Sequence, residues 1–550
     1  MTGVQTCALP ISGRAHLPKA CRDAAWVRPM TWQDVLRLNE DKMRLASAEG
    51  FAGAIVAAAP PSAAKTAGSA VTLFEPHPVL EFGSNGWAFG SEVTGGPGVL
   101  LGNPHFPWAT TNRFWQVHQT IPGTLDVMGV TLSGLPSVVI GFNPSIAWTH
   151  TVSTDRHFTF FELTLDPNDP TVYLVDGRRE TMQVREVTVA VKGAAPVRRT
   201  VYHSRYGAVV SVPAMGLAWS RTHAYALKDA EELNFRAPEA WLAIERADSV
   251  DAIRRAISKP VAIPWVNTIA TDSAGRVLYA DVTPTPALTE ERLARCAAGK
   301  ANAALAPMRL YVLNGSDSSC DWSADPSAPS AGLLQAAQMP LLVRRDFVAN
   351  SNDSFWLAND IAPQRGFPAI VGAVDEPQSL RTRQGLLTIH RAISEHPVSG
   401  GGITPAVVKE MIFGNDSLAA ELALDDLLTL CEDAAAAQDS HGEAVDLTEA
   451  CAVLRRWDRR MDLDSRGAAL FAEFFMPLSR QPGGFPAATV PFDPADPLHT
   501  PPHQRLQPLQ RQRQMRPPLV IRHRVDLVHN HRRHRRQIPP RSRCRQQDIQ

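Results

Sequence analysis

A mixed α+β fold is the class that this sequence predicts, and three observations carry the prediction. Short alternating runs of apolar and polar residues occur after residue 84, among them VREVTVAV and RTVYHSRYGAVVSV. Alternation with a period of two is typical of strands that bury one face. Helical stretches such as PEAWLAIERADSVDAIRRAIS lie between these runs. With 550 residues, 44% of them hydrophobic, the chain is also long enough to bury large cores.

The N-terminal part predicts one helix followed by an exposed connector. Residues 31–50, TWQDVLRLNEDKMRLASAEG, repeat apolar residues at helical spacing. Thr31 is the expected N-cap and Gly50 the expected stop, because a hydroxyl accepts from the first N–H groups and glycine ends helices readily. Residues 58–83 mix Pro, Ala, Ser and Gly without periodicity, as expected of a connector that proteolysis can reach.

A strand-rich body begins at Ser84. RVLYADV follows the turn residues Asp272 to Gly275 and completes a predicted hairpin. Helices are expected in the PEAW stretch, with Pro238 near its first turn, and in VDLTEACAVLRRWDRRMDL around Cys451.

The two ends of the chain differ from the body. Residues 501–550 hold thirteen arginines, no lysine and two acidic residues, although the whole chain has 55 basic and 55 acidic side chains. We expect a disordered or frameshifted tail, and no nucleic-acid partner, because the segment has no aromatic residue for stacking on bases and no helical pattern. Residues 1–18 resemble translated adapter sequence, so we expect an artefactual N-terminus.

Several classes of protein and site are not predicted. No run of eighteen apolar residues occurs, so we expect no membrane-spanning helix. The first residues lack a basic stretch that leads into a long apolar one, so we do not expect them to be a signal peptide. The seven cysteines form no CxxC pair, so we expect no zinc site. Cys296 with Cys320, and Cys431 with Cys451, flank loop-like stretches. Their spacing alone leaves open two disulfides or four buried thiols.

The dipeptide Gly83-Ser84, which opens the run GSNGWAFG, is the candidate chemical centre. A serine hydroxyl is a weak nucleophile at neutral pH and needs a base. One such base is the serine's own α-amine, freed by cleavage before the serine, whose unperturbed pKa is roughly 7.7 to 8.0. Gly-Ser alone more often forms a turn, so this interpretation needs support from other segments.

Four segments supply that support. They are GSNGWAFGSE at 83–92, LLGNPHFPW at 100–108, IPGTLDVMGVTLSGLPSVVIGFNPSIAWTHTVST at 121–154 and FVANSNDSFWLAN at 347–359. Together they resemble the penicillin acylase family of N-terminal-nucleophile hydrolases, and most closely its acyl-homoserine lactone and aculeacin acylase branch. The resemblance implies a four-layer αββα fold. Both flanks are shorter than in the family, so we expect the fold to be incomplete.

The resemblance also implies roles for individual residues. Ser84 matches the nucleophile that self-cleavage exposes, which makes Gly83 the last residue removed. His105 matches a position beside the nucleophile, where an imidazole can bond the serine amine or hydroxyl. The Val152 N–H and the Asn352 side-chain amide match the donors to the oxyanion, with Asn350 as a lesser candidate. Arg381 matches an arginine near the site that functions in maturation.

The substrate pocket and the cofactors follow from the same resemblance. Phe106 and Trp265 are the expected lining residues of an apolar acyl pocket. No cofactor and no metal are expected. Some penicillin acylases bind calcium, but where their ligands would fall this chain has RHFT at 156–159.

The resemblance finally implies an organisation and an activity. We expect a small-subunit remnant over 19–57, a removed connector over 58–83 and a large subunit over 84–500, the two subunits forming a heterodimer from one precursor. The expected reaction is hydrolysis of N-acylated small molecules such as acyl-homoserine lactones. Penicillin, cephalosporin or aculeacin-type acylase activity, or an inactive fragment, are the alternatives. The family is exported, which predicts a periplasmic or secreted protein and favours the two disulfides.

Overall fold

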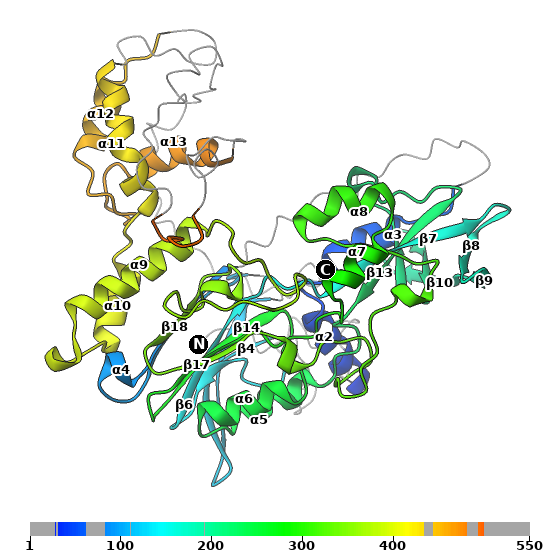
Figure 1. Ribbon diagram of the computed structural model, residues 1–550, viewed down its shortest axis with the longest axis horizontal. Coiled ribbons are helices and arrows are strands. Elements are labelled where there is room, and N and C mark those ends of the chain that lie inside the picture. The colour runs from blue at the N-terminus through cyan, green and yellow to red at the C-terminus, as the bar shows by residue number, and fades with distance from the viewer. Residues whose placement is uncertain are drawn as a thin grey trace. The chain divides into compact units, whose positions relative to one another are not determined.

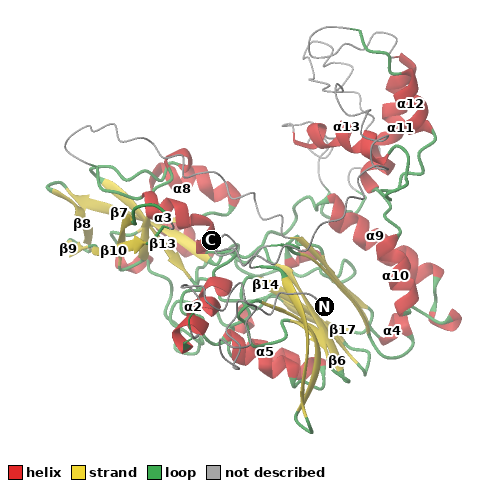
Figure 2. Ribbon diagram, turned by 180° about the vertical axis from the view of Figure 1, so that it is seen from behind, coloured by secondary structure: helices red, strands yellow, loops and turns green. Residues whose placement is uncertain are grey.

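The computed structural model describes residues 31–61, 83–109, 112–191, 193–433, 444–480 and 493–499, together with Arg28. The chain divides into two compact units, the larger containing Met30–Val374 and the smaller containing Asp375–Gln547. The predicted α+β class is confirmed, since helices accompany antiparallel sheets (Figures 1 and 2). The expected artefactual N-terminus, the basic tail and connector residues 62–82 lie outside the described residues.

Two of the three sheets in the larger unit position the candidate site. The first is three-stranded, in the order β18 (Phe347–Asn350), β1 (Gly83–Phe89) and β2 (Val99–His105). The second is seven-stranded, in the order β17 (Leu341–Arg344), β15 (Val277–Ala280), β14 (Val266–Asp272), β6 (Ile146–Val152), β5 (Ile140–Phe142), β4 (Leu125–Leu132) and β3 (Phe114–Ile121).

The two sheets pack face to face, and helices cover the other face of the larger sheet. A Cβ added at Gly86 of β1 would lie 3.1 Å from the Thr149 side chain of β6. Neighbouring side chains on a strand point to opposite faces. His150 accordingly accepts from the Trp241 indole N–H of α5 (Ala237–Glu245) at 3.1 Å, and α6 (Val250–Ser258) follows α5 along the same sheet (Figure 1). These are three successive layers of the expected αββα order.

The third sheet is eight-stranded and antiparallel except for one parallel strand, β16 (Val312–Asn314), beside β7. Its order is β10 (Gln183–Val189), β11 (Val197–Ser204), β12 (Gly207–Val210), β13 (His223–Asp229), β7 (Phe158–Asp166), β8 (Asp169–Val175) and β9 (Arg178–Thr181). Helices α3 (Ala52–Ala57), α7 (Glu290–Cys296) and α8 (Gly299–Leu305) lie against it (Figure 1).

Strand β1 is the middle strand of its sheet, and all seven of its residues are buried. It is paired with β2 along its whole length, from Gly83 opposite His105 to Phe89 opposite Val99. On its other side, the pairing with β18 begins only at Gly86, opposite Asn350. On that edge, the backbone N–H and C=O groups of the first residues of β1 therefore need hydrogen-bond partners from the residues that follow β18 in the chain.

The predicted N-terminal helix is correct at its start and wrong at its end. Helix α2 (Trp32–Met43) begins after Thr31, whose side chain forms a capping box with Asp34. It ends at Met43, and Gly50 is not its stop, because the chain continues through a short 3-10 helix into α3. The early end has a physical reason: Ser47 Oγ and the Ala48 N–H both donate to the buried Asp229 carboxylate, which turns the chain.

Two predictions inside the body are confirmed. The hairpin around Asp272 to Gly275 joins β14 to β15. The PEAW stretch is helical but forms two helices, because Ser249 caps α6 by accepting from the Ala252 N–H.

The smaller unit is helical within the residues that are described. It contains α9 (Leu380–Glu395), α10 (Pro405–Phe413), α11 (Leu418–Asp433), α12 (Thr448–Arg455) and α13 (Ala468–Arg480). The remaining short elements of the chain are α4 (Ser91–Thr94) and 3-10 turns such as η5 (Ser318–Cys320).

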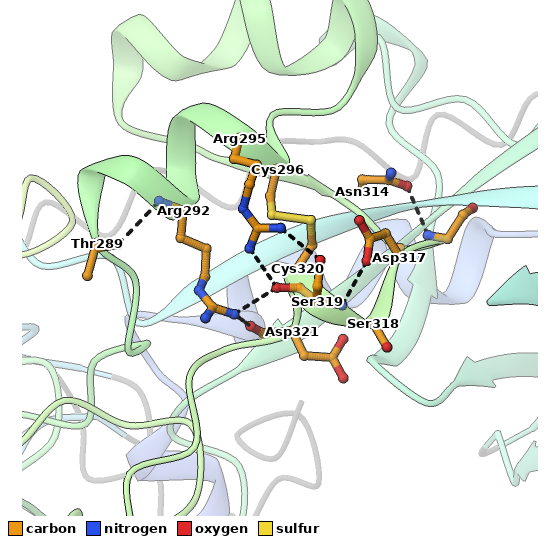
Figure 3. Close-up of a disulfide and its surroundings, with 12 residues drawn as sticks. Thr289, Arg292, Arg295, Cys296, Asn314, Asp317, Ser318, Ser319, Cys320 and Asp321 are labelled. Carbon is orange, nitrogen blue, oxygen red and sulfur yellow. Dashed lines mark hydrogen bonds between the residues drawn. A yellow bond between two sulfur atoms is a disulfide. The ribbon is translucent and has the colours of Figure 1, made fainter. Parts of the chain in front are cut away.

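Both predicted cysteine pairs have their sulfur atoms at bonding distance, 2.08 Å for Cys296 and Cys320 and 2.13 Å for Cys431 and Cys451. The first pair ties the end of α7 to η5, and the second ties α11 to α12. Figure 3 shows the Arg292 and Arg295 guanidinium groups beside the first pair. Both donate to the Ser319 carbonyl oxygen, at 2.9 and 3.0 Å.

Replacing Cys296 and Cys320 together by serine should lower the free energy of unfolding of the larger unit. The cross-link closes a loop with a sequence separation of 24, for which loop entropy predicts about 3 kcal/mol. Urea unfolding without reductant measures the difference, and peptide mapping without reduction verifies the bond in the unmodified chain. Equal urea midpoints for the two proteins would contradict the prediction.

Acid should destabilise the larger unit before most carboxylates titrate. Burial lowers the pKa of His150 and of His157 to about 4. The unfolded chain binds these two protons near the ordinary pKa of about 6.5 and the folded chain does not, so stability falls as pH drops from about 6.5 to 4, by about 3 kcal/mol for each histidine. Urea unfolding at pH 7 and pH 5 measures this. His150→Gln should shrink the pH effect, because it removes one of the two buried imidazoles.

Candidate active site

Ser84 lies at the start of β1 and is buried, with 2% of its surface exposed. Its strand partner is Pro104, which has no N–H to offer. On the other edge, where β18 has already ended, the Ser84 N–H donates to the side-chain oxygen of Asn352 over 2.6 Å. The Asn352 side chain thus supplies the hydrogen-bond acceptor that a further residue of β18 would otherwise provide.

Asn352 is itself held in a conformation that few residues adopt. Its φ is +70°, in the left-handed region that asparagine tolerates better than most L-residues. Its N–H donates to Asn350 Oδ1 at 2.8 Å, and its side-chain amide donates to the Val152 carbonyl at 3.0 Å. The structure therefore brings Ser84, Val152 and Asn352 together. The Asn350 side chain accepts the Asn352 N–H and so helps to position Asn352.

The bond before Ser84 is closely surrounded. Ser84 Oγ donates to the Gly83 carbonyl oxygen at 2.6 Å. Opposite Gly83 lies His105, and a Cβ added at Gly83 would come within 2.8 Å of the His105 Nδ1 atom. The other imidazole nitrogen lies 2.9 Å from Asn103 Oδ1. Only glycine fits before Ser84 without displacing the imidazole, and the catalytic role predicted for His105 stays a prediction.

An apolar cavity of about 40 Å³ opens beside Ser84 and Val152. Both predicted lining residues, Phe106 and Trp265, contribute to its wall. Phe106 stacks on Phe114 with ring centroids 4.7 Å apart and faces Trp265 at 6.4 Å. A cavity lined by apolar rings beside a nucleophile can hold a hydrocarbon group.

The backbone of Trp265 is strained and is fixed by a buried carboxyl group. Its φ is +32°, an unusual value for a bulky residue. The Trp265 N–H donates to Glu231 Oε1 at 3.0 Å, and its indole N–H donates to the Lys42 carbonyl at 3.0 Å. Burial raises the pKa of Glu231 well above its ordinary value. Local strain of this kind is retained where the surroundings hold it in place.

Several lining residues were not predicted from the sequence. They include Met43, Phe114, Leu135, His150 and Trp241. Met43 precedes Gly83-Ser84 in the chain, so residues on both sides of this dipeptide build the cavity. Apolar residues in strands and helices carry no local signal that separates pocket lining from ordinary core, and only the fold reveals them.

His150 lines the cavity as a neutral side chain. Trp241 donates its indole N–H to His150 Nε2 at 3.1 Å, and His150 Nδ1 lies 3.1 Å from the Asn267 carbonyl oxygen. An indole nitrogen only donates, so the imidazole proton must be on Nδ1. With the pKa lowered to about 4 by burial, this imidazole stays uncharged at neutral pH.

Arg381 lies in the smaller unit, in the first turn of α9, so its predicted role near Ser84 stays a prediction. Among the described residues, no group of three or more His, Cys, Asp or Glu side chains is arranged to hold a metal ion. In the same residues no helix is long and apolar enough to cross a membrane.

Comparison with known proteins identifies similar chains. Aculeacin-A acylase from Actinoplanes utahensis is 42% identical over 491 residues, and the acyl-homoserine lactone acylase PvdQ from Pseudomonas fluorescens is 39% identical over 497 residues. Each alignment covers 88% of this chain and 61% of the relative. The chain therefore spans less than two thirds of the length of these relatives.

A solved structure, the thermostable penicillin G acylase from Alcaligenes faecalis, matches with a TM-score of 0.49 and 17% sequence identity, covering 71% of this chain and 62% of that one. The family model described as penicillin amidase matches residues 20–531. This chain belongs to the penicillin amidase family.

Proposed function

We propose that this chain is an amide hydrolase in which Ser84 becomes an N-terminal nucleophile and removes an acyl chain from N-acylated small molecules. The observation that carries the proposal is the position of Ser84. The Ser84 N–H donates a hydrogen bond to the Asn352 side chain, and the Ser84 hydroxyl donates one to the Gly83 carbonyl oxygen. Ser84 also borders the apolar cavity.

Maturation would begin with the Ser84 hydroxyl. Its oxygen attacks the Gly83 carbonyl carbon, the C–N bond breaks, and the proton of the hydroxyl passes to the departing nitrogen, leaving an ester. Water then hydrolyses the ester to a Gly83 carboxylate and a free Ser84 α-amine. The hydroxyl is already 2.6 Å from the Gly83 oxygen, and the absent side chain of Gly83 leaves room for His105.

Catalysis would use the amine that maturation frees. The neutral amine takes the Ser84 hydroxyl proton while the oxygen attacks the substrate amide carbon. The Val152 N–H and the Asn352 side-chain amide would stabilise the oxyanion, and removing one such donor typically costs about 10²- to 10³-fold in rate. The protonated α-amine then gives its proton to the substrate nitrogen as the C–N bond breaks, so the amine product leaves and an acyl ester remains on Ser84. Water hydrolyses this ester and releases the fatty acid.

The similarity to acyl-homoserine lactone acylase PvdQ favours acyl-homoserine lactones as substrates. The cavity wall is formed mainly by rings and aliphatic side chains, which suits an uncharged hydrocarbon group and disfavours a charged glutaryl group. Penicillin, cephalosporin or aculeacin-type acylase activity is the second candidate, favoured by the similarity to aculeacin-A acylase. Assays of medium and long acyl-homoserine lactones against phenylacetyl and glutaryl amides separate the candidates.

The two products of cleavage would stay associated. Residues before the connector make non-covalent contacts with residues after it. Arg44 forms an ion pair with Asp229 at 3.1 Å, and the Lys42 carbonyl oxygen accepts a hydrogen bond from the Trp265 indole N–H. These contacts support the proposal of a heterodimer from one precursor. An exported location, periplasmic or secreted, would suit the two cysteine pairs, because disulfides persist in oxidising compartments.

Expression of the chain should yield a fragment that begins at Ser84, and Ser84→Ala should abolish it because no hydroxyl is left to attack Gly83. Intact mass spectrometry and N-terminal sequencing measure both. The exposed Ser330→Ala is the matched control and should mature normally. An uncleaved wild-type chain that behaves like Ser84→Ala would show that this chain is an inactive fragment.

Phe114→Ala should shift the matured enzyme toward longer acyl chains. Removing a ring that stacks on Phe106 enlarges the cavity, and each added methylene in an apolar pocket is worth about 1 to 3 kcal/mol of discrimination. The ratio of kcat/KM for long over short acyl-homoserine lactones should rise at least about tenfold. Phe142→Ala, an exposed phenylalanine of the same sheet, is the control. An unchanged ratio in Phe114→Ala would argue against this cavity as the acyl site.

A further inference from the structure

A second cavity lies in the larger unit, against the eight-stranded sheet. Its volume is about 610 Å³, within the usual size range of small-molecule sites, and it shares no lining residue with the cavity beside Ser84. Strands β7 and β13 form one side of it, and α8 and the short 3-10 turn η3 (Pro213–Met215) form the other (Figure 1). The proposed mechanism gives this cavity no role.

Most of the cavity wall is apolar. The apolar side chains that line it are Ala214, Met215, Ala301, Ala304, Leu305 and Met308. Methionine side chains are flexible and polarizable, so they can adapt to bound groups of different shape. A wall of this composition suits a hydrocarbon group better than it suits a sugar or a phosphate.

Three polar side chains from the two strands meet at one place in this wall. Tyr225 lies directly opposite Glu162 in the pairing of β13 with β7, and its hydroxyl donates to Glu162 Oε2 at 3.0 Å. Burial raises the pKa of Tyr225 to about 12, so this hydroxyl keeps its proton at neutral pH. His223 Nε2 lies 3.9 Å from Glu162 Oε1, which is too far for a hydrogen bond.

The second carboxylate oxygen of Glu162 can accept from a ligand. Within the described part of the chain, no hydrogen bond reaches Glu162 Oε1, and the side chain is 20% exposed. A molecule that fills the cavity would remove water from this oxygen and must supply a donor in exchange. A protonated amine supplies both the donor and the opposite charge.

Gly299, at the start of α8, leaves space for this carboxylate. Its φ is +54°, in the left-handed region that favours glycine. A Cβ added there would lie 3.2 Å from Glu162 Oε2 and 3.4 Å from Oε1, so a larger residue would crowd both oxygens. The helix is anchored just before this point, where Cys296 is bonded to Cys320. The sequence at this corner therefore keeps the carboxylate accessible from the cavity.

Lys300 also lines the cavity, but it is exposed. Its long apolar stem allows its ammonium group to remain in water. Among the described residues, Lys300 has no ion pair with Glu162 or with another acid. The carboxylate therefore keeps its negative charge for a bound cation.

We propose that this cavity is a binding site for a small primary amine with a hydrocarbon body. The ammonium group would donate to Glu162 Oε1, and the hydrocarbon would lie against Met215, Leu305 and Met308. The site goes beyond the proposed function, because it requires neither cleavage at Ser84 nor the cavity beside it.

Binding of n-hexylammonium to the full chain at pH 7 tests the role of the charge. Hexan-1-ol and hexanoate are comparison probes of the same length, one uncharged and one anionic. Isothermal titration calorimetry should show that n-hexylammonium binds at least about tenfold more tightly than either, because only the amine can form a charge-assisted hydrogen bond with the carboxylate.

Glu162→Gln keeps the shape of the side chain, removes its charge and should weaken n-hexylammonium binding at least about tenfold. The matched control is Glu186→Gln on the exposed strand β10, which should change the affinity by less than about twofold. Absence of n-hexylammonium binding, equal affinities for the three probes, or an unchanged affinity in Glu162→Gln would overturn the proposal.

Two substitutions on α8 test the location. Ala304 lines the cavity and Ala303 does not, although both are exposed. Ala304→Trp should fill part of the cavity and weaken n-hexylammonium binding at least about tenfold, whereas Ala303→Trp should stay within about twofold of wild type. Equal affinities in the two variants would place the amine elsewhere and overturn the proposal. Thermal melts verify that each variant folds. Cleavage at Ser84 should be normal in Glu162→Gln, so failure of amine binding and failure of maturation are separate results.

Discussion

The hydrogen bond from the Ser84 N–H to the Asn352 side chain, 2.6 Å long, is the constraint on which the rest of the site depends. It exists because β18 stops pairing with β1 at Gly86, so that the first residues of a buried middle strand need another acceptor. Asn352 supplies that acceptor only by adopting a left-handed backbone. The Ser84 backbone is therefore already positioned in the uncleaved chain, and the proposed maturation and catalysis would use the same arrangement of residues.

Buried polar side chains around the site hold this arrangement through specific hydrogen bonds. Glu231 fixes the strained Trp265 in the cavity wall, and His150 is held neutral between Trp241 and Asn267. Buried polar networks are costly unless every member is satisfied. Because such groups surround the apolar cavity, the positions of its wall residues are fixed by directional hydrogen bonds as well as by packing.

The sequence predicted the parts of the site that lie in contiguous motifs. Ser84, Val152 and Asn352 each occur in a recognisable segment, and the structure brings these segments together. Gly50 was wrong as a helix stop because a distant carboxylate, Asp229, turns the chain earlier. Phe114 and Trp241 could not be predicted, because their positions depend on which strands and helices become neighbours.

If Ser84 acts as proposed, the hydroxyl of the newly exposed serine carries the acyl group during turnover. This intermediate can be located by quenching the matured enzyme during turnover of a slow acyl ester, digesting it, and finding the added acyl mass by fragmentation. We expect one acyl group on the N-terminal serine of the fragment that begins at Ser84. Substrate turnover with the acyl group on another residue, or with none on Ser84 under conditions that trap the intermediate, would contradict it.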